Sequence, residues 1–245
     1  SRGGSHGLGK NAPLVNSAAR AIFASTCWFD EDGEIKNLLQ GRCQLMTHEV
    51  DGKNYSPTGY WGDKDYQPLS RVPSQCNWLD RENVPGTTIA LIGWVPISRN
   101  WEQLIIGYAI TSYFAAFLRG KLELTVGNTT VSSDTILELL QNEGIRKALI
   151  KDDSLNEDEW ELSQLLAECL GTGTDVTKDT FQVVGDIGQT RLSMVCREGA
   201  PNKIALIRRN ILITDFVPGF FKRKQGSLND YVGAVECLNP TGEDL

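Results

Sequence analysis

The sequence predicts an α+β protein with mostly antiparallel or mixed sheets. Strand-like segments come first, a long apolar helix and further helices follow, and strand-like segments return near the end of the chain. A parallel α/β fold would instead alternate strands and helices regularly. The turn signals Asp32-Gly33 and Asp51-Gly52 also indicate hairpins, which join antiparallel strands.

The first half of the chain is predicted to begin with a helix and to continue in strands. Apolar residues at helical spacing predict a helix over 14–24, and Pro13 suits its first turn. The strand-like runs are 26–29, 35–39, 42–50 and 53–60. A loop over 61–86 then leads to a buried strand over 87–94. The apolar run 101–119 predicts a helix that ends at Gly120.

The second half is predicted to hold shorter helices and the returning strands. The expected helices are 133–140, 145–150 and 160–170, with an exposed acidic segment over 151–161. The expected strands are 121–126, 181–184, 191–196, 203–207, 210–216 and 231–237. We place a domain boundary in the helical middle, which gives domains over 1–125 and 126–245.

Composition excludes several classes of protein. With 40% apolar and 22% charged residues, the 245-residue chain has an ordinary globular composition. A net charge of −7 disfavours non-specific coating of nucleic acid. The longest apolar run, 104–118, is shorter than the roughly 20 residues that a bilayer span needs. We therefore expect no membrane association and a cytoplasmic location.

Metal and nucleophile chemistry has few candidates in this sequence. The six cysteines form no Cys-x-x-Cys pair and there are only two histidines, so a zinc site is disfavoured and we expect reduced thiols. We expect His48 to be structural, and a Ser–His–Asp hydrolase is disfavoured because no Gly-x-Ser-x-Gly elbow occurs. Runs of carboxylates, such as 30–32 and 157–159, are typical of solvated turns and helix starts.

A glycine-rich loop near the start of the chain is the strongest functional signal. It reads Gly4-Ser5-His6-Gly7-Leu8-Gly9, and it is followed by Lys10 and Asn11. Glycines allow backbone N–H groups to turn toward an anion, a lysine adds a positive charge, and a following helix adds unpaired N–H groups. The loop therefore indicates phosphate binding; a flexible tail before a helix is the alternative.

Two templates fit this loop. A Walker A loop matches Gly4, Gly9 and Lys10, but Asn11 stands where a hydroxyl should meet the magnesium ion. The pattern Gly-x-x-Gly-x-Gly fits better, and with the helix after it the chain resembles the GHKL ATPases, the superfamily of gyrase B and histidine kinases. It looks most like the stand-alone bacterial members, including those encoded near anti-phage systems.

This resemblance implies a fold and a site. It implies a two-layer sandwich of mixed sheet and helices, followed by a second, transducer-like lobe. ATP would bind with Mg²⁺, its phosphates held by residues 4–11. Thr87, in the Gly-Thr that opens a strand, would reach a phosphate or a bridging water across the pocket. A lysine of the second lobe would reach the γ-phosphate, with Lys203, Lys222 and Lys224 as candidates.

Two further parts of the GHKL site lie ahead of the glycine loop in the family. One is a helix with a magnesium-holding Asn and a water-activating Glu; the other is an Asp-x-Gly-x-Gly loop that reads adenine. We expect them in an N-terminal extension of roughly a hundred residues. ATP hydrolysis is expected only if that extension exists.

The resemblance implies a molecular switch in which nucleotide orders the loop and drives homodimerisation or engagement of a partner protein. The alternative is a non-catalytic interaction module in which the glycines form a linker. A basic and aromatic tip over 220–224 also leaves DNA as a weaker candidate partner.

Overall fold

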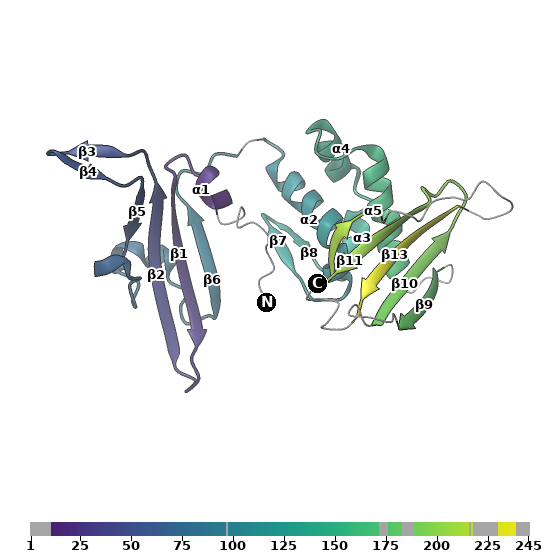
Figure 1. Ribbon diagram of the computed structural model, residues 1–245, viewed down its shortest axis with the longest axis horizontal. Coiled ribbons are helices and arrows are strands. Elements are labelled where there is room, and N and C mark those ends of the chain that lie inside the picture. Colours follow the sequence, from purple (N-terminus) through teal and green to yellow (C-terminus); the bar gives the residue numbers. More distant parts are fainter. Residues whose placement is uncertain are drawn as a thin grey trace. The chain divides into compact units, whose positions relative to one another are not determined.

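The structure is a computed structural model that describes residues 11–96, 98–171, 176–182, 189–215, 217 and 230–238. The fold is α+β, as the sequence predicts. The chain forms two compact units, Ser1–Ile97 and Ser98–Leu245 (Figure 1). The sequence analysis placed its boundary at residue 125, whereas the division into compact units precedes the long helix and assigns that helix to the second unit.

The first unit is built around an antiparallel four-stranded sheet with the strand order β5-β2-β1-β6 (Figure 1). The strands are β1 (Ala21–Phe29), β2 (Ile35–Gln44), β5 (Thr58–Trp61) and β6 (Gly86–Leu91). The predicted hairpin between β1 and β2 is confirmed, and its turn residue Gly33 has a φ of +79°. Positive φ at this place is what a tight hairpin turn requires.

The second predicted hairpin is also confirmed, as a separate two-stranded ribbon. It consists of β3 (His48–Val50) and β4 (Lys53–Tyr55), which pair antiparallel around Asp51 and Gly52. Both turn residues have positive φ, +51° and +74°. Two consecutive positive φ values define the turn type that matches the twist of the flanking strands.

The predicted helix over 14–24 is wrong beyond its first turn. Helix α1 spans only Ala12–Val15, and from Ala21 the chain is already in β1. Arg20, with a φ of +49°, reverses the chain between the two elements. Ladders with β2 and β6 satisfy the backbone of β1 on both sides, and β-branched and aromatic residues such as Ile22 and Phe23 favour a strand.

The two faces of the first unit's sheet differ in cover. One face carries Ser25 and Leu39, both fully buried, and Phe23, which packs edge-on against Trp78 at 6.3 Å. The opposite face we call the open face. Since strand partners share a face and alternate residues point to opposite faces, the ladder registers assign residues to it. They are Ile22, Ala24, Thr26, Leu38, Gln40, Arg42, Gln44, Tyr60, Thr87 and Ile89.

The open face is not a buried core. Ile89 is 51% exposed and Tyr60 is 47% exposed. The sequence analysis expected a buried strand over 87–94, and this is wrong, because β6 ends at Leu91 and lies at the edge of the sheet. An apolar run alone does not distinguish a central strand from an edge strand.

The second unit packs helices on a five-stranded sheet with the order β12-β11-β13-β10-β9 (Figure 1). The helices are α2 (Trp101–Leu118), α3 (Ile136–Leu139), α4 (Glu143–Lys151) and α5 (Glu157–Leu170). The strands are β9 (Val176–Gln182), β10 (Gln189–Cys196), β11 (Lys203–Arg208), β12 (Ile211–Thr214) and β13 (Tyr231–Cys237), with a small hairpin of β7 (Leu124–Val126) and β8 (Thr129–Val131). Strands β11 and β13 pair in parallel and the other neighbours are antiparallel, so the sheet is mixed, as predicted.

Helix α2 forms the centre of this unit's core. Its residues Ile110, Phe114 and Phe117 are almost completely buried, together with Trp160 of α5. Gly107 allows α4 to approach closely, because a Cβ at this position would lie 2.4 Å from Leu149 Cδ1. No described helix is both long and apolar enough to cross a membrane.

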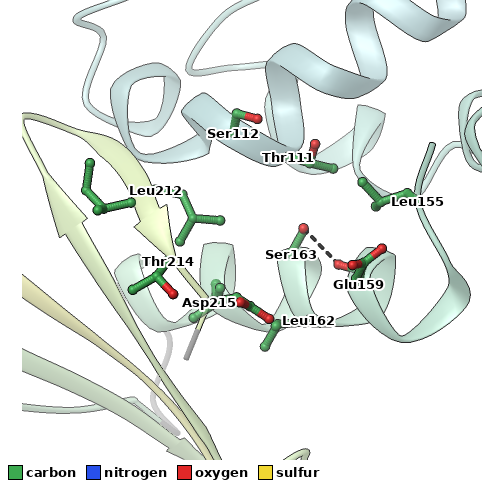
Figure 2. Close-up of a pocket in the computed structure, with 11 residues that line it drawn as sticks. Thr111, Ser112, Leu155, Glu159, Leu162, Ser163, Leu212, Thr214 and Asp215 are labelled. Carbon is green, nitrogen blue, oxygen red and sulfur yellow. Dashed lines mark hydrogen bonds between the residues drawn. The ribbon is translucent and has the colours of Figure 1, made fainter. Parts of the chain in front are cut away.

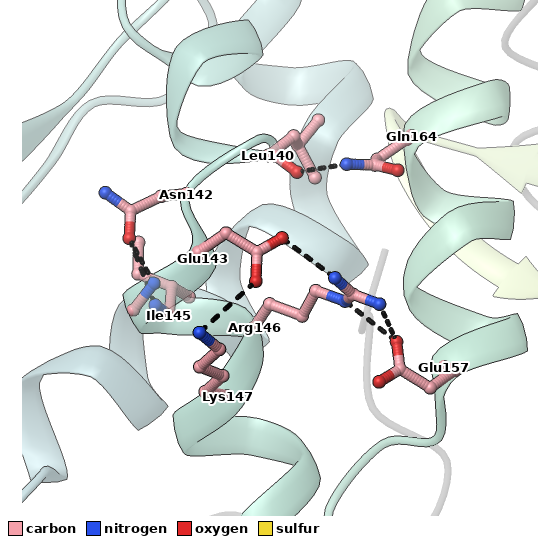
Figure 3. Close-up of polar contacts among 9 residues, drawn as sticks. Leu140, Asn142, Glu143, Ile145, Arg146, Lys147, Glu157 and Gln164 are labelled. Carbon is pink, nitrogen blue, oxygen red and sulfur yellow. Dashed lines mark hydrogen bonds and ion pairs between the residues drawn. The ribbon is translucent and has the colours of Figure 1, made fainter.

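Helices α4 and α5 are tied together at their N-terminal ends (Figure 3). The guanidinium of Arg146 contacts Glu143 of its own helix and Glu157 of α5. The Asn142 side chain accepts hydrogen bonds from the first backbone N–H groups of α4, and Asn156 forms a capping box with Glu159 at the start of α5. Such caps satisfy N–H groups that have no partner within the helix.

A buried ion pair joins α2 to the sheet. Arg119, directly after α2, contacts Glu236 of β13, whose side chain is only 3% exposed. The same guanidinium also contacts Asn210, in the turn between β11 and β12. Burial and the nearby Arg191 guanidinium lower the pKa of Arg119. Arg191 is the strand partner of Glu236, so one buried carboxylate lies beside two cations.

All six cysteines are free thiols. Cys27 and Cys169 are buried, and Cys196 is exposed.

Candidate functional site

The glycine loop itself, Gly4, Ser5, His6, Gly7, Leu8, Gly9 and Lys10, lies outside the described residues. Of the predicted site residues, Asn11 and Thr87 are described. Asn11 is the residue before α1 and does not cap that helix with its side chain. Because α1 has only four residues, the sequence argument that a helix N-terminus contributes to phosphate binding is not supported.

A hollow of about 580 Å³ opens beside α1 in the first unit. Its lining is Asn11, Leu14, Val15, Arg20, Arg42 and Gln44. Arg42 and Gln44 belong to the open face of the sheet, so α1 lies over the β1–β2 end of that face. Asn11, the residue that directly follows the glycine loop in the sequence, therefore lies on the wall of this hollow.

The hollow has a positive character. Two of its described lining residues are arginines, and none of the described ones is acidic. Among the described residues, neither Arg20 nor Arg42 takes part in an ion pair. The Nε of Arg42 is buried and has no hydrogen-bond partner. An unpaired buried N–H costs free energy.

Thr87 stands on the same open face, further along the sheet. It is the strand partner of Thr26, and the two hydroxyl oxygens lie 3.1 Å apart. Thr26 also donates to the Gly86 carbonyl at 3.2 Å. The Thr87 side chain is exposed, so its hydroxyl is accessible from solvent.

The local structure explains why a glycine precedes Thr87. Gly86 has a φ of +137°, and a Cβ there would lie 2.7 Å from Arg81 Nη2. Arg81 in turn donates to the Thr88 hydroxyl at 2.7 Å and to the Val84 carbonyl at 2.9 Å. Arg81 therefore contacts the start of β6 on the face opposite to the open face, and Thr87 lies on the open face.

The open face thus carries Arg42, which lines the hollow, and Thr87, further along the sheet. Arg42 pairs with Ile22 of β1, and Thr87 pairs with Thr26 of the same strand. At about 3.3 Å per strand residue, the two points lie roughly 13 Å apart along β1. A ligand that reached from the hollow to Thr87 would be an extended molecule.

Other residues singled out in the sequence have local structural roles or are not described. Lys203 forms an ion pair with Asp215 at 2.8 Å in the second unit, and Lys222 and Lys224 lie outside the described residues, as does the tip over 220–224. His48 is exposed and stacks on Tyr55 at a centroid distance of 5.4 Å. The Glu34 backbone N–H and the Lys36 ammonium hold the pKa of Asp30 below its usual value, which suits a hairpin turn rather than an acid catalyst.

Within the described ranges, no three His, Cys, Asp or Glu side chains are close enough to hold a metal ion. The donor set of the hollow, with two guanidinium groups and two amides, fits an anion and not a cation. An Mg²⁺ ion accompanying a nucleotide would thus need ligands from other residues or from the phosphates.

A second hollow, of about 270 Å³, lies in the second unit between α2, α5 and β12 (Figure 2). Leu162 and Leu166 form apolar walls, and the Ser163 hydroxyl donates to the Glu159 carbonyl. Asp215, which also lines it, is engaged by Lys203. We found no unpaired buried polar group among its described lining residues.

The sequence analysis did not identify Arg20 and Arg42 as site residues. They stand 22 positions apart in the chain, by subtraction of their numbers, and neither belongs to a motif. Only the register of β1 with β2 brings them to one hollow, so no local pattern could have indicated them.

Comparisons with known proteins place few constraints on this site. No family model and no curated protein matches the chain. Among solved structures, the chain is similar to the 43K ATPase domain of Thermus thermophilus gyrase B in complex with an aminocoumarin. The TM-score is 0.34 and the identity 13%, over 95% of this chain and 59% of that chain, so this chain spans less than two thirds of that domain. With so low a TM-score, conclusions about function rest on the residues of the chain itself.

Proposed function

We propose that this chain is the lid-to-transducer part of a GHKL-type nucleotide-binding protein, and that its glycine loop holds the phosphates of ATP. The main observation behind the proposal is that residues 4–10 are followed directly by Asn11, which lines a positively charged hollow. The same sheet face carries Thr87, which the resemblance assigns to the nucleotide pocket.

The chemistry of each part suits a phosphorylated ligand. Glycines without a Cβ let backbone N–H groups face an anion, and Lys10 supplies a point charge. The described residues that line the hollow include no acidic side chain that would repel a phosphate. Thr87, roughly 13 Å away along β1, would then contact the other end of the nucleotide, directly or through a water molecule.

We further propose that nucleotide binding acts as a switch. Phosphate contacts would order the loop, and this order would drive dimerisation or the engagement of a partner protein. The resemblance to stand-alone bacterial ATPases makes anti-phage defence the first pathway in which to test this role. Hydrolysis is a separate step, for which the resemblance requires the Asn and Glu described above.

The test is a calorimetric titration of a non-hydrolysable ATP analogue with Mg²⁺ into the full-length protein and into a Gly7→Asp variant. We expect binding by the wild type and none by the variant, because the new carboxylate would repel the phosphates. Asn54→Asp is the matched control, since it adds the same charge at an exposed position of the β3–β4 ribbon, away from the hollow, with almost no change in shape.

Absence of binding by the wild-type protein would overturn the proposal. The chain would then be better described as an interaction module whose glycines form a linker. Limited proteolysis gives an independent readout: cleavage within residues 3–12 should slow when the analogue is present.

A further inference from the structure

We infer that Arg20 and Arg42 form a guanidinium pair that binds a phosphate group in the hollow beside α1. This inference deepens the proposed function and rests on it in one respect, which is that the phosphate belongs to the nucleotide held by the glycine loop.

The first argument is the lack of partners for these two cations. Two other cations of the first unit have described partners: Lys36 contacts Asp30 and Glu34, and Arg81 binds Thr88. Arg20 and Arg42 have no described ion pair or side-chain hydrogen bond, although they line the same cavity. Two like charges facing one cavity repel each other, and a bound anion would relieve that repulsion.

The second argument is the burial of one donor. Arg42 is only partly exposed, and its Nε has essentially no access to bulk solvent. It lies in the sheet between Ile22 of β1 and Tyr60 of β5, so the base of its side chain is fixed by strands on both sides. A fixed guanidinium loses little conformational entropy when it binds a ligand.

The third argument is the backbone of Arg20. This residue has a φ of +49°, which is uncommon for a residue with a side chain. Its N–H donates to the Ser17 carbonyl at 2.9 Å, and its carbonyl accepts from the Gln44 N–H at 2.9 Å. These bonds fix the backbone of Arg20 beside Gln44, which lines the same hollow.

The class of ligand follows from the donors. A guanidinium group presents parallel N–H donors that match two oxygens of a phosphate, and two such groups match a multiply charged anion better than a single carboxylate. Asn11 and Gln44 add amide groups to the same wall. Since Asn11 directly follows Lys10, a phosphate in this hollow would lie next to the end of the glycine loop.

The experiment measures the affinity of the full-length protein for two probes, the Mg²⁺ complex of a non-hydrolysable ATP analogue and inorganic tripolyphosphate. The variants are Arg42→Met, Arg42→Lys and Arg20→Met, with Arg71→Met as the control because Arg71 is an exposed arginine that does not line the hollow. We expect Arg42→Met to weaken binding about tenfold to hundredfold, as for loss of one charge-assisted hydrogen bond, and Arg71→Met to have no effect.

The conservative variant separates geometry from charge. Arg42→Lys keeps the positive charge but loses the fork of donors, so we expect it to bind more weakly than the wild type and more tightly than Arg42→Met. The midpoint of thermal unfolding of the free protein is a second readout. It should be unchanged or higher in Arg42→Met, because an unpaired buried donor is removed. A lower midpoint with unchanged affinity would assign Arg42 a purely structural role and overturn the inference.

The outcomes separate this inference from the proposed function. Suppose that the analogue binds and that Gly7→Asp abolishes this binding. If Arg42→Met and Arg20→Met nevertheless bind like the wild type, the inference fails and the proposed function stands. If the analogue does not bind but tripolyphosphate does, and Arg42→Met weakens that binding, the arginine pair is a phosphate site and the nucleotide function fails.

Discussion

Replacement of the buried Glu236 should reveal how strongly the second unit depends on one ion pair. In Glu236→Gln the side chain keeps its shape and one acceptor oxygen, but its negative charge is lost. Arg119 then lies near Arg191 without the carboxylate that it contacts in the wild type. The free energy of unfolding should fall because the partly desolvated Arg119 guanidinium loses its ion-pair partner.

The size of the effect follows from the burial of the two partners. Removal of one partner from a fully buried pair costs about 3–5 kcal/mol. The Glu236 side chain is 3% exposed but that of Arg119 is 33% exposed, so water can partly solvate the freed guanidinium. We therefore expect the lower end of this range, about 3 kcal/mol. For a domain of this size that corresponds to a decrease in Tm of roughly 6–12 °C.

The structure also predicts an asymmetry between the partners. Arg119→Met leaves the Glu236 carboxylate, whose side chain is only 3% exposed, without its ion-pair partner, whereas in Glu236→Gln water can partly solvate Arg119. Arg119→Met should therefore cost more than Glu236→Gln. Asn210→Gly, which removes the contact with Arg119 and accommodates the φ of +62° at this turn, should cost less than about 1 kcal/mol and serves as the control.

The assay is urea denaturation combined with hydrogen exchange read by mass spectrometry. In Glu236→Gln, peptides of β13 and α2 should lose protection, while peptides of β1 in the first unit should not, which provides an internal reference. A destabilisation below about 1 kcal/mol, or a larger cost for Glu236→Gln than for Arg119→Met, would refute the reasoning.

Four further predictions concern the second unit. Gly107→Ala should destabilise this unit by about 1–2 kcal/mol in urea denaturation, because the new methyl group would overlap Leu149. This cost should exceed the gain from the better helix propensity of alanine. The double variant with Leu149→Ala should lose less stability than the sum of the two single variants. Asn156→Ala should cost about 1–2 kcal/mol through loss of the capping box, and an unchanged urea midpoint would contradict this. Burial raises the pKa of the Cys169 thiol from 9.0 to about 12. Above pH 9 the thiol therefore loses its proton when the protein unfolds, and the free energy of unfolding should fall as the pH rises from about 9 toward 12. In the native protein at pH 8 a thiol reagent should modify Cys196 well before Cys169.

Local sequence signals determined much of the secondary structure. Strand β13 has the bounds that were predicted, 231–237, and α2 ends one residue before the predicted end. The Asp-Gly turns of both hairpins were predicted because positive φ is a property of the turn residues themselves. The start of α5 lies earlier than predicted because the capping signal at Asn156 and Glu159 was not used.

Tertiary contacts decided the elements for which two conformations compete. Residues 21–24 have helical spacing of apolar side chains, yet they form a strand because β2 and β6 satisfy their backbone from both sides. The entry of β6 depends on Arg81, whose contacts with Thr88 and Val84 are not visible in a linear pattern. Pairing of this kind comes from residues far apart in the chain, which periodicity does not record.

The sequence by itself determined the α+β class and both hairpins, and it predicted the phosphate-binding chemistry of the glycine loop, because each depends on residues that are neighbours in the chain. Only the tertiary structure decided that Arg42 and Thr87 lie on one sheet face, and that Arg20 and Arg42 line one hollow with Asn11. The physical reason is that strand register, a long-range property, sets which side chains point to the same side and which charges are left without a partner.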